Sequence, residues 1–337
     1  MSAERYDDPG LRPPGMSVGR IRAADKATLR VAAWRTQEGC AGTVCVLPGR
    51  GEFIEKYYEV VAELLGRGFD VVVMDWRGQG GSTRQADHPA KGHIDDFSAY
   101  QRDLEALRVE ALEPYARRPF YALAHSMGGA ILLDAAHAGR CFFERVATTA
   151  PMIDLCRLRY ARALRGLARS LCVSGLAKAF APGAGGPKPY PLKPFAGNPI
   201  TSDPGRYARM GRLVAASPEI AVGAPTVGWV DAAFRLMWRF ENPDFAREIF
   251  EPFLIVAAGD DRVVDTPAIE TFAARMKAGR CVTLRGARHE ILMERDPIRA
   301  QFWAAFDAFI PGAPAQGARA PDAAAAAGGG APVALGS

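Results

Sequence analysis

The sequence predicts an α/β protein with a mostly parallel central sheet flanked by helices. From residue 21 onward, short apolar strands alternate with helical patterns such as those at 95–113 and 267–276. Two of the apolar runs, 69–75 and 253–258, are nearly continuous, which is typical of central strands buried on both faces. Helices between such strands imply crossover connections, and these join parallel neighbours in one sheet.

The predicted elements also indicate how the chain is organised. Strands are expected near 28–34, 43–47, 69–75, 120–124, 146–150, 253–258 and 281–284. The long interval before 253 has no strand pattern, so we expect a helical cap inserted there. The expected parts are a disordered leader at 1–17, a core made of 18–154 and 246–310, a cap at 155–245, and a disordered tail at 311–337 rich in Ala, Gly and Pro.

Composition narrows the possible function classes. The chain has 337 residues, of which 49% are hydrophobic, so a large core is available. No apolar stretch approaches the roughly 18 residues that span a bilayer, and the acidic N-terminus lacks the apolar core of a secretory signal. The cysteines and histidines never cluster at metal-ligand spacing. We therefore expect a cytoplasmic protein that uses no cofactor or metal and binds no nucleic acid.

Ser126 lies in the most informative segment of the chain. The apolar run at 120–124 ends in the motif Ala-His-Ser-Met-Gly-Gly at 124–129, and a helical pattern follows at 130–137. A serine between strand and helix is typical of a sharp turn that exposes the hydroxyl as a nucleophile. The neighbours are small because the two backbones pass within contact distance at such a turn. Ser126 is the predicted nucleophile, although Ala124 replaces the first glycine of the usual Gly-x-Ser-x-Gly pattern.

A literal match to Gly-x-Ser-x-Gly occurs elsewhere, at 15–19 around Ser17. Pro13 and Pro14 precede this match, so no strand is expected to lead into it, and no helical pattern follows. The context therefore indicates that Ser17 has no catalytic role.

A serine hydroxyl needs a base to take its proton, so a histidine is required. His137 is expected on the surface of the helix after the nucleophile, and His125 should point to the other side of the turn. His88 and His93 precede the nucleophile, and His93 is expected to fix its own loop. His289 lies in a loop just past the last predicted strand and is the last histidine in the chain, so it is the predicted base.

The acid that orients the histidine should lie between nucleophile and base in the chain, just past the end of a central strand. The segment Gly-Asp-Asp-Arg-Val-Val at 259–264 has this position, so the cap precedes the strand that carries the acid. We favour Asp261 over its neighbour Asp260, and the sequence leaves the choice open. Asp265 is a weaker candidate, which we expect to cap the following helix.

The oxyanion hole requires backbone N–H groups aimed at the developing charge. One is expected from Met127, which follows the nucleophile, and the other from the loop Pro-Gly-Arg-Gly-Glu at 48–52. We assign the Arg50 N–H as the second donor. Gly49 is expected to contact the substrate, because a glycine lets the backbone approach it closely.

These motifs resemble those of the bacterial lysophospholipase and monoacylglycerol lipase group of serine α/β-hydrolases, over roughly 17–310. The resemblance is carried by the segments at 48–52, 75–82, 93–97, 124–129, 259–264 and 287–290. In the cap, 198–203 and 223–229 are more similar to the lysophospholipase branch. The resemblance implies an α/β-hydrolase fold with a helical cap and an ester substrate. Pro48 departs from the pattern, because many relatives have a histidine there that can buttress the oxyanion loop.

The predicted cap carries a local positive charge. Residues 155–202 contain five arginines, three lysines and no acidic residue, which gives +8, whereas the whole chain is +5. One face of a predicted helix carries Tyr160, Leu164, Leu167 and Leu171, and the opposite face carries Arg162, Arg165 and Arg169. Such a helix either packs its leucines on the core or contacts an anionic membrane surface. Both arrangements leave a positive field that favours a phospholipid substrate.

These observations predict a serine hydrolase that cleaves the carboxylic ester of single-chain lipids, with a lysophospholipid as the preferred substrate. Trp229, Phe234 and Trp238 are expected to line a channel for the acyl chain. A monoacylglycerol lipase or broad carboxylesterase would use the same residues and is the first alternative. A hydrolase-fold protein that binds a ligand without turnover is the second. The expected partners are a lipid ester and, through the basic cap, the inner face of an anionic membrane.

Overall fold

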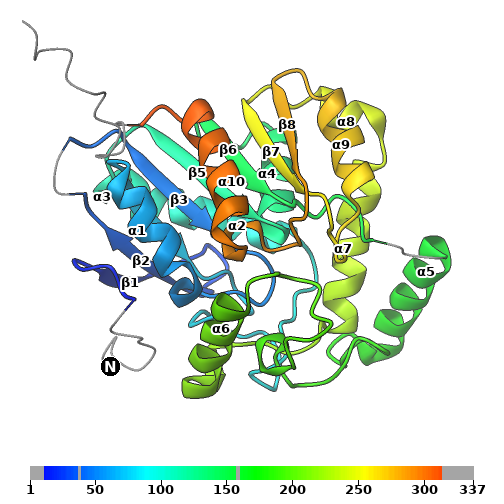
Figure 1. Cartoon of the computed structure of the whole chain (residues 1–337). Coiled ribbons are helices and arrows are strands. Elements are labelled where there is room, and N and C mark those ends of the chain that lie inside the picture. Colours follow the sequence, from blue (N-terminus) through cyan, green and yellow to red (C-terminus); the bar gives the residue numbers. More distant parts are fainter. Residues whose placement is uncertain (1–10, 37–38, 157–159, 313–337) are drawn as a thin grey trace, which may run out of the picture.

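The computed structural model describes residues 11–36, 39–156 and 160–312. At its centre is an eight-stranded sheet in the order β1-β2-β4-β3-β5-β6-β7-β8 (Figure 1). The strands are β1 (Ser17–Arg22), β2 (Thr28–Trp34), β3 (Thr43–Leu47), β4 (Asp70–Met74), β5 (Phe120–His125), β6 (Arg145–Thr149), β7 (Phe253–Ala258) and β8 (Gly279–Leu284). Strand β2 pairs antiparallel with β1 and β4, and all other neighbours pair in parallel. The predicted α/β class with a mostly parallel sheet is confirmed.

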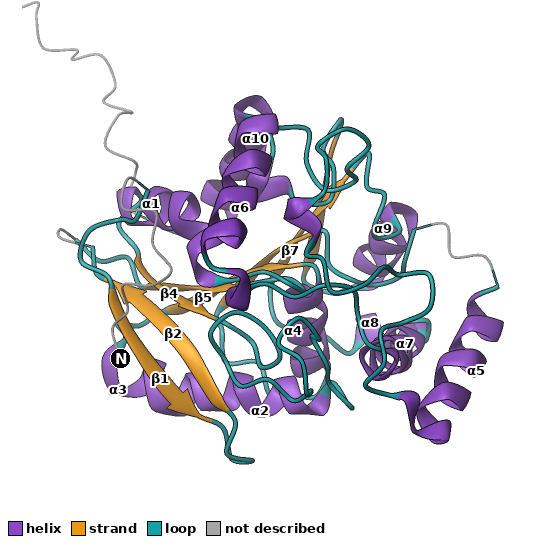
Figure 2. Ribbon diagram, turned by 90° about the horizontal axis from the view of Figure 1, so that it is seen from below, coloured by secondary structure: helices purple, strands orange, loops and turns teal. Residues whose placement is uncertain are grey.

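Helices cover both faces of the sheet (Figure 2). One face is covered by α1 (Tyr58–Gly66) and α10 (Asp296–Phe309), and the other by α2 (Ser98–Ala106), α4 (Met127–His137) and α9 (Thr266–Arg275). Strands β3, β4, β5 and β7 are buried along their whole length, which explains their continuous apolar sequences. The shorter helical segments near the core are η2 (Ile54–Tyr57), η3 (Leu107–Leu112), α3 (Glu113–Tyr115) and η7 (Ile291–Met293).

The chain between β6 and β7 is helical, with no strand among its described residues. Its elements are α5 (Ala161–Leu171), η4 (Cys172–Leu176), η5 (Tyr190–Leu192), α6 (Pro204–Ala216), η6 (Pro218–Ile220), α7 (Val227–Phe240) and α8 (Pro243–Arg247). Helix α6 begins after Asp203, whose carboxylate accepts from the Arg206 amide, and α7 begins after Thr226, whose hydroxyl accepts from the Trp229 amide. Among the described residues, no helix has the length and apolar content needed to cross a bilayer.

The N-terminal edge of the sheet differs from the prediction. Strand β1 was not expected, because its sequence is polar and its residues are mostly exposed. It pairs with β2 alone, at the edge of the sheet, where no apolar face is required. Residues 11–17 of the predicted leader belong to the folded body, since the Trp34 indole donates to the Pro13 carbonyl oxygen and β1 starts at Ser17. Residues 1–10 and the tail beyond 312 lie outside the described residues.

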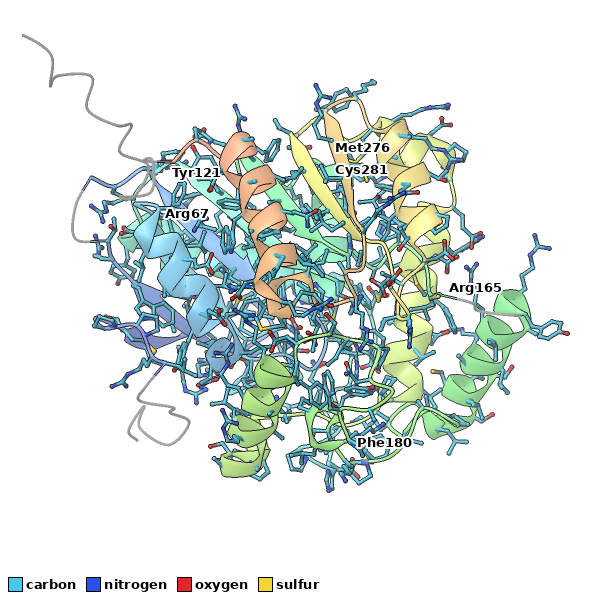
Figure 3. The ribbon with its side chains drawn as sticks, viewed as in Figure 1. Arg67, Tyr121, Arg165, Phe180, Met276 and Cys281 are labelled. Carbon is cyan, nitrogen blue, oxygen red and sulfur yellow. The ribbon has the colours of Figure 1, made fainter. Side chains whose placement is uncertain are left out.

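Helix α5 leaves two of its three leucines, Leu164 and Leu167, exposed. It lies alongside α7 at the outside of the molecule in both views (Figures 1 and 2), and Ala168 is buried. Tyr160, Leu164 and Leu167 are 82%, 37% and 52% exposed. The core-packing alternative is therefore met only in part, because Ala168 joins the hydrophobic core and Leu171 is half-buried, whereas Leu164 and Leu167 are exposed. Figure 3 shows Arg165 on the side of α5 that faces α7, where it pairs with Glu241.

Candidate active site

The predicted nucleophile, base and acid meet at one edge of the sheet. Ser126 follows β5, Asp261 follows β7 and His289 follows β8, and these parallel strands all end at the same edge. The Nε2 atom of His289 lies 3.0 Å from Ser126 Oγ, and its Nδ1 atom lies 2.8 Å from Asp261 Oδ2. These distances allow a proton to pass from the hydroxyl to an imidazole whose orientation the carboxylate fixes.

Ser126 is held at a strained turn between β5 and α4. Its backbone has φ 48° and ψ −112°, a conformation that non-glycine residues rarely adopt. The Ser126 amide donates to the Thr149 carbonyl oxygen at 3.0 Å, and its own carbonyl oxygen accepts from the Met152 amide at 3.1 Å. A Cβ atom at Gly128 would lie 2.4 Å from the Leu47 carbonyl oxygen, so only glycine fits there. The close backbone approach expected from the motif is present.

Asp261 is the member of the acidic pair that contacts the histidine. Its second oxygen, Oδ1, accepts from the amides of Val263 at 2.7 Å and Val264 at 3.0 Å. Burial alone would raise the pKa of Asp261, but His289 and these two amides lower it below its usual range, so it is ionised. Asp260 is exposed to solvent. Asp265 caps α9, because its carboxylate accepts from the Ala268 amide at 2.8 Å.

The loop after β3 leaves one amide unpaired between two that are bonded. The Gly49 amide donates to the Glu52 carboxylate, and the Gly51 amide donates to Gln79 Oε1 at 2.9 Å. Between them, the Arg50 amide has no partner within the described part of the chain. The amide of Met127, at the start of α4, has no partner there either. Both predicted oxyanion donors thus lack a partner among the described residues, and their role stays a prediction.

Glu52 braces this loop, because its carboxylate accepts from the Gly49 amide. Its carboxylate accepts from the Tyr57 hydroxyl at 2.6 Å and from the Lys56 ammonium at 2.5 Å. Lys56 also pairs with Glu290 at 2.7 Å, beside the predicted base. Burial alone would lower the pKa of Lys56. The negative charges of Glu290 and Glu52 have the larger effect, so the pKa of Lys56 is raised above its usual value.

This buried network could not be predicted from the sequence. The spacing of Glu52 and Lys56, four residues apart, was the one available signal, since such pairs meet on a helical turn. The third member, Glu290, comes from the other end of the chain, and only the folded structure brings it to Lys56.

His125 packs against the predicted base. The two imidazole rings are 4.8 Å apart between centroids, and His125 Nδ1 lies 3.0 Å from Thr149 Oγ1. Burial lowers the pKa of His125 to about 4, so the ring is neutral at neutral pH. His125 therefore fixes the position of His289 by packing, without adding a charge beside it.

The other histidines lie away from the site. His93 contacts Thr226 Oγ1 at 2.9 Å and Asp95 at 3.0 Å, and so joins its own loop to the start of α7. His137 stacks on Phe245 at the end of α4. His88 lies in an exposed loop.

A cavity of about 390 Å³ opens at Ser126 and His289. Trp229 and Phe234 line it, as expected, but Trp238 does not and is 65% exposed. Trp238 follows Trp229 by about two and a half helical turns, so the two side chains leave opposite faces of α7. Gly49 is buried and does not line the cavity. Its carbonyl oxygen accepts a hydrogen bond from the Gln79 side chain at 2.7 Å. Its expected contact with the substrate is therefore not supported.

A larger cavity, of about 850 Å³, lies beside β1, β2 and α3. Ser17, the serine of the literal motif, lines it, but none of its lining residues is a histidine. This cavity therefore offers a hydroxyl without a histidine to activate it. Among the described residues, no group of His, Cys, Asp and Glu side chains is arranged to hold a metal ion.

Comparison with protein families agrees with the geometry of the site. The family model Hydrolase_4, described as "Serine aminopeptidase, S33", matches residues 39–296, which include Ser126, Asp261 and His289. This chain belongs to the Hydrolase_4 family. The match spans the sheet from β3 to β8 together with the inserted helices, so it covers the whole site.

Individual relatives of this Hydrolase_4 chain are similar over most of their length. Lysophospholipase L2 of Escherichia coli K12 is 35% identical over 267 residues, which is 76% of each chain. A probable lysophospholipase L2 of Haemophilus influenzae is 28% identical over 253 residues, 74% of this chain and 78% of the relative. The resemblance to the lysophospholipase and monoacylglycerol lipase group is confirmed.

Solved structures share the fold. A monoglyceride lipase from Saccharomyces cerevisiae superposes with a TM-score of 0.70 at 20% identity, over 89% of this chain and 97% of the other. A carboxyl esterase from Bacillus coagulans gives the same TM-score at 18% identity, over 88% and 98%. The α/β-hydrolase fold implied by the resemblance is confirmed.

Proposed function

We propose that this carboxylic ester hydrolase is a lysophospholipase that acts through an acyl-enzyme on Ser126. The observation that carries the proposal is the hydrogen-bonded chain from Ser126 through His289 to Asp261 at the wall of a cavity. The substrate class is supported by the 35% identity to lysophospholipase L2 of E. coli and by the basic side chains that line the same cavity.

The reaction follows from the positions of these groups. Ser126 Oγ attacks the ester carbonyl carbon while His289 Nε2 takes its proton. The oxyanion of the tetrahedral intermediate binds the Arg50 and Met127 amides, and Asp261 stabilises the imidazolium. His289 then protonates the departing glycerol oxygen, which leaves the acyl group on Ser126. Water, deprotonated by the same imidazole, hydrolyses the acyl-enzyme and releases the fatty acid.

The cavity suits a lipid with one acyl chain and a charged head group. Apolar side chains of α7, among them Trp229, Ala233 and Phe234, line part of its wall. Arg50, Lys188 and Lys193 line it as well. A positive field at the cavity raises the local concentration of anionic substrates, whereas a neutral glyceride gains nothing from it.

Steady-state kinetics test this choice of substrate. We expect kcat/KM to be at least about tenfold higher for a lysophosphatidylglycerol than for the monoacylglycerol of the same chain length, since a single charge-assisted contact contributes that much. Both substrates are assayed below their critical micelle concentrations, with Ser126→Ala as the blank. A preference for the monoacylglycerol would favour the first alternative, a monoacylglycerol lipase. Turnover of neither substrate would favour a ligand-binding protein.

We further propose a cytoplasmic location with peripheral contact to an anionic membrane through α5 and η4. These elements expose Leu164, Leu167, Val173 and Leu176, and Tyr160 just before α5 is exposed as well. Exposed basic residues such as Arg162 and Lys178 lie nearby in the sequence. Apolar side chains next to basic ones are the features with which interfacial helices bind anionic lipid. This contact would bring the enzyme to the surface from which its lipid substrate is drawn.

Vesicle sedimentation tests the membrane contact. We expect the protein to sediment with vesicles of phosphatidylcholine and phosphatidylglycerol at low salt, and a Leu164→Ser, Leu167→Ser double variant to lose most of this binding. The matched control is Val109→Ser on η3, which replaces an exposed apolar side chain outside the cap. Wild-type protein that stays in the supernatant, or equal losses in both variants, would contradict the proposal.

A further inference from the structure

Four basic residues line the catalytic cavity, and they differ in how their charge is compensated. The Lys56 ammonium lies between two carboxylates, at 2.5 Å from Glu52 and 2.7 Å from Glu290. Lys188 and Lys193 are exposed, so water solvates them. Arg50 is half-buried, and among the described residues no carboxylate pairs with it. Arg50 is therefore the one shielded cation at the cavity wall without a counter-charge in the part of the chain described.

The Arg50 guanidinium is positioned but incompletely bonded. Its Nη2 donates to the Gly223 carbonyl oxygen at 3.1 Å, and its Cζ lies 5.1 Å from the centre of the Trp229 ring. Neither Nε nor Nη1 has a hydrogen-bond partner among the described residues, and Nε is sealed from solvent. Burial lowers the pKa of Arg50 to about 10, which leaves the group protonated at neutral pH.

A guanidinium in this state favours an anion at the cavity wall. A shielded charge without a partner has lost hydration energy that only an opposite charge or further acceptors restore. The planar guanidinium donates two N–H bonds in a geometry that matches phosphate oxygens. The Trp229 ring on one side and the bond to the Gly223 carbonyl oxygen restrict the guanidinium, so less side-chain entropy remains to be lost on binding.

We propose that the Arg50 guanidinium binds the phosphoryl group of the substrate head group. The inference rests on the proposed lysophospholipase function and deepens it. In a lysophospholipid, a short glycerol segment separates the ester carbonyl from the phosphorus atom. In Arg50, a side chain with a similar number of bonds separates the backbone amide, which is the proposed oxyanion donor, from the guanidinium. In this arrangement a single residue contacts both the ester carbonyl and the phosphoryl group, which a monoacylglycerol lacks.

The competing interpretation is that Arg50 only ties the oxyanion loop to the cap through Gly223. Such a tie would affect every ester to the same degree, because all of them use the same oxyanion hole. A phosphoryl contact would affect only substrates that carry the phosphoryl group. The ratio of two kcat/KM values, measured on one variant, therefore separates the two roles even if the variant is less active overall.

The first experiment measures this ratio for a lysophosphatidylglycerol over the monoacylglycerol of equal chain length. In Arg50→Gln we expect the ratio to fall by about tenfold to a hundredfold. In Arg50→Lys we expect a smaller fall, because lysine keeps the positive charge but lacks the paired N–H donors of the guanidinium. The matched control is Arg212→Gln, which removes an exposed arginine of α6 outside the cavity and should leave the ratio unchanged. If wild type prefers the lysophospholipid and Arg50→Gln has the same ratio as wild type, the inference is overturned but the proposed function stands.

A second experiment does not depend on turnover. In the Ser126→Ala protein we expect the dissociation constant for lysophosphatidylglycerol to rise about tenfold or more when Arg50→Gln is added, and that for monoacylglycerol to change far less. Inorganic phosphate is titrated as a separate probe. If phosphate competes with lysophosphatidylglycerol and Arg50→Gln abolishes this competition, a phosphoryl site at Arg50 is supported. If Arg50→Gln weakens the binding of both lipids equally, the inference is overturned. If wild type shows no preference for the phospholipid, the proposed function fails, and the inference fails with it.

Discussion

Replacement of Ser126 by alanine is expected to lower kcat/KM by at least about 10⁴-fold on every ester that the protein hydrolyses. The substitution removes the atom that forms the acyl-enzyme, and no other hydroxyl among the described residues is paired with His289. The residual rate would come from the oxyanion donors and substrate binding alone. The measurement is fatty-acid release at saturating and subsaturating substrate, with circular dichroism to show that the variant is folded.

Ser17→Ala is the matched control for this experiment. Ser17 lies in the literal Gly-x-Ser-x-Gly motif, on an exposed edge strand and beside a cavity without a histidine. We expect this variant to keep wild-type activity. A large loss in Ser17→Ala together with a small loss in Ser126→Ala would mean that the literal motif, and not the strand–turn–helix context, identifies the nucleophile.

Asp261→Asn is expected to lower kcat by up to about 10⁴-fold with little change in KM. The amide has nearly the shape of the carboxylate but cannot stabilise the imidazolium, and its NH₂ group favours the wrong tautomer of His289. The variant is assayed for kcat and KM on one lysophospholipid over a range of pH, so that any loss is assigned to the chemical step.

Asp260→Asn is the matched control for Asp261→Asn. It makes the same chemical change at the adjacent position, where the side chain is exposed and has no hydrogen bond to His289. Activity within about twofold of wild type is expected, as for surface substitutions away from specific interactions. If the two variants lost activity equally, the roles assigned to the acidic pair would be wrong.

Local patterns in the sequence were enough to predict most of the core. Strands β2, β3 and β7 lie at the predicted positions, because runs of Val, Ile, Leu and Ala bounded by polar segments are a strong signal for buried strands. Strand β1 was missed because an exposed edge strand needs no apolar pattern. Its partner β2 determines its position, and that pairing is not visible in the sequence of either strand alone.

Features that depend on tertiary contacts were less predictable. The choice between Asp260 and Asp261 rests on which carboxylate meets His289 and the amides of Val263 and Val264. No difference between the two neighbours is visible in the sequence. The brace formed by Glu52, Lys56 and Glu290 joins two ends of the chain, since Glu290 lies more than 230 positions after the other two.

In the cap, helical periodicity predicted an apolar face but not what that face contacts. The spacing of the leucines in α5 indicated an apolar face, and that face exists, but periodicity alone does not say what covers it. In the structure α5 contacts α7 and buries Ala168, while Leu164 and Leu167 are exposed. The same reasoning applies to Trp238, which shares a helix with Trp229 but not the face that lines the cavity.

The central claim is that His289, held by Asp261, turns the Ser126 hydroxyl into the nucleophile that carries the acyl group. Its most direct test is reaction of the intact protein with a fluorophosphonate probe, followed by mass spectrometry of the tryptic peptides. We expect one adduct per chain, on the peptide that contains Ser126, with none in His289→Ala protein under the same conditions. An adduct on a different serine, or an unmodified Ser126 in active protein, would contradict the account.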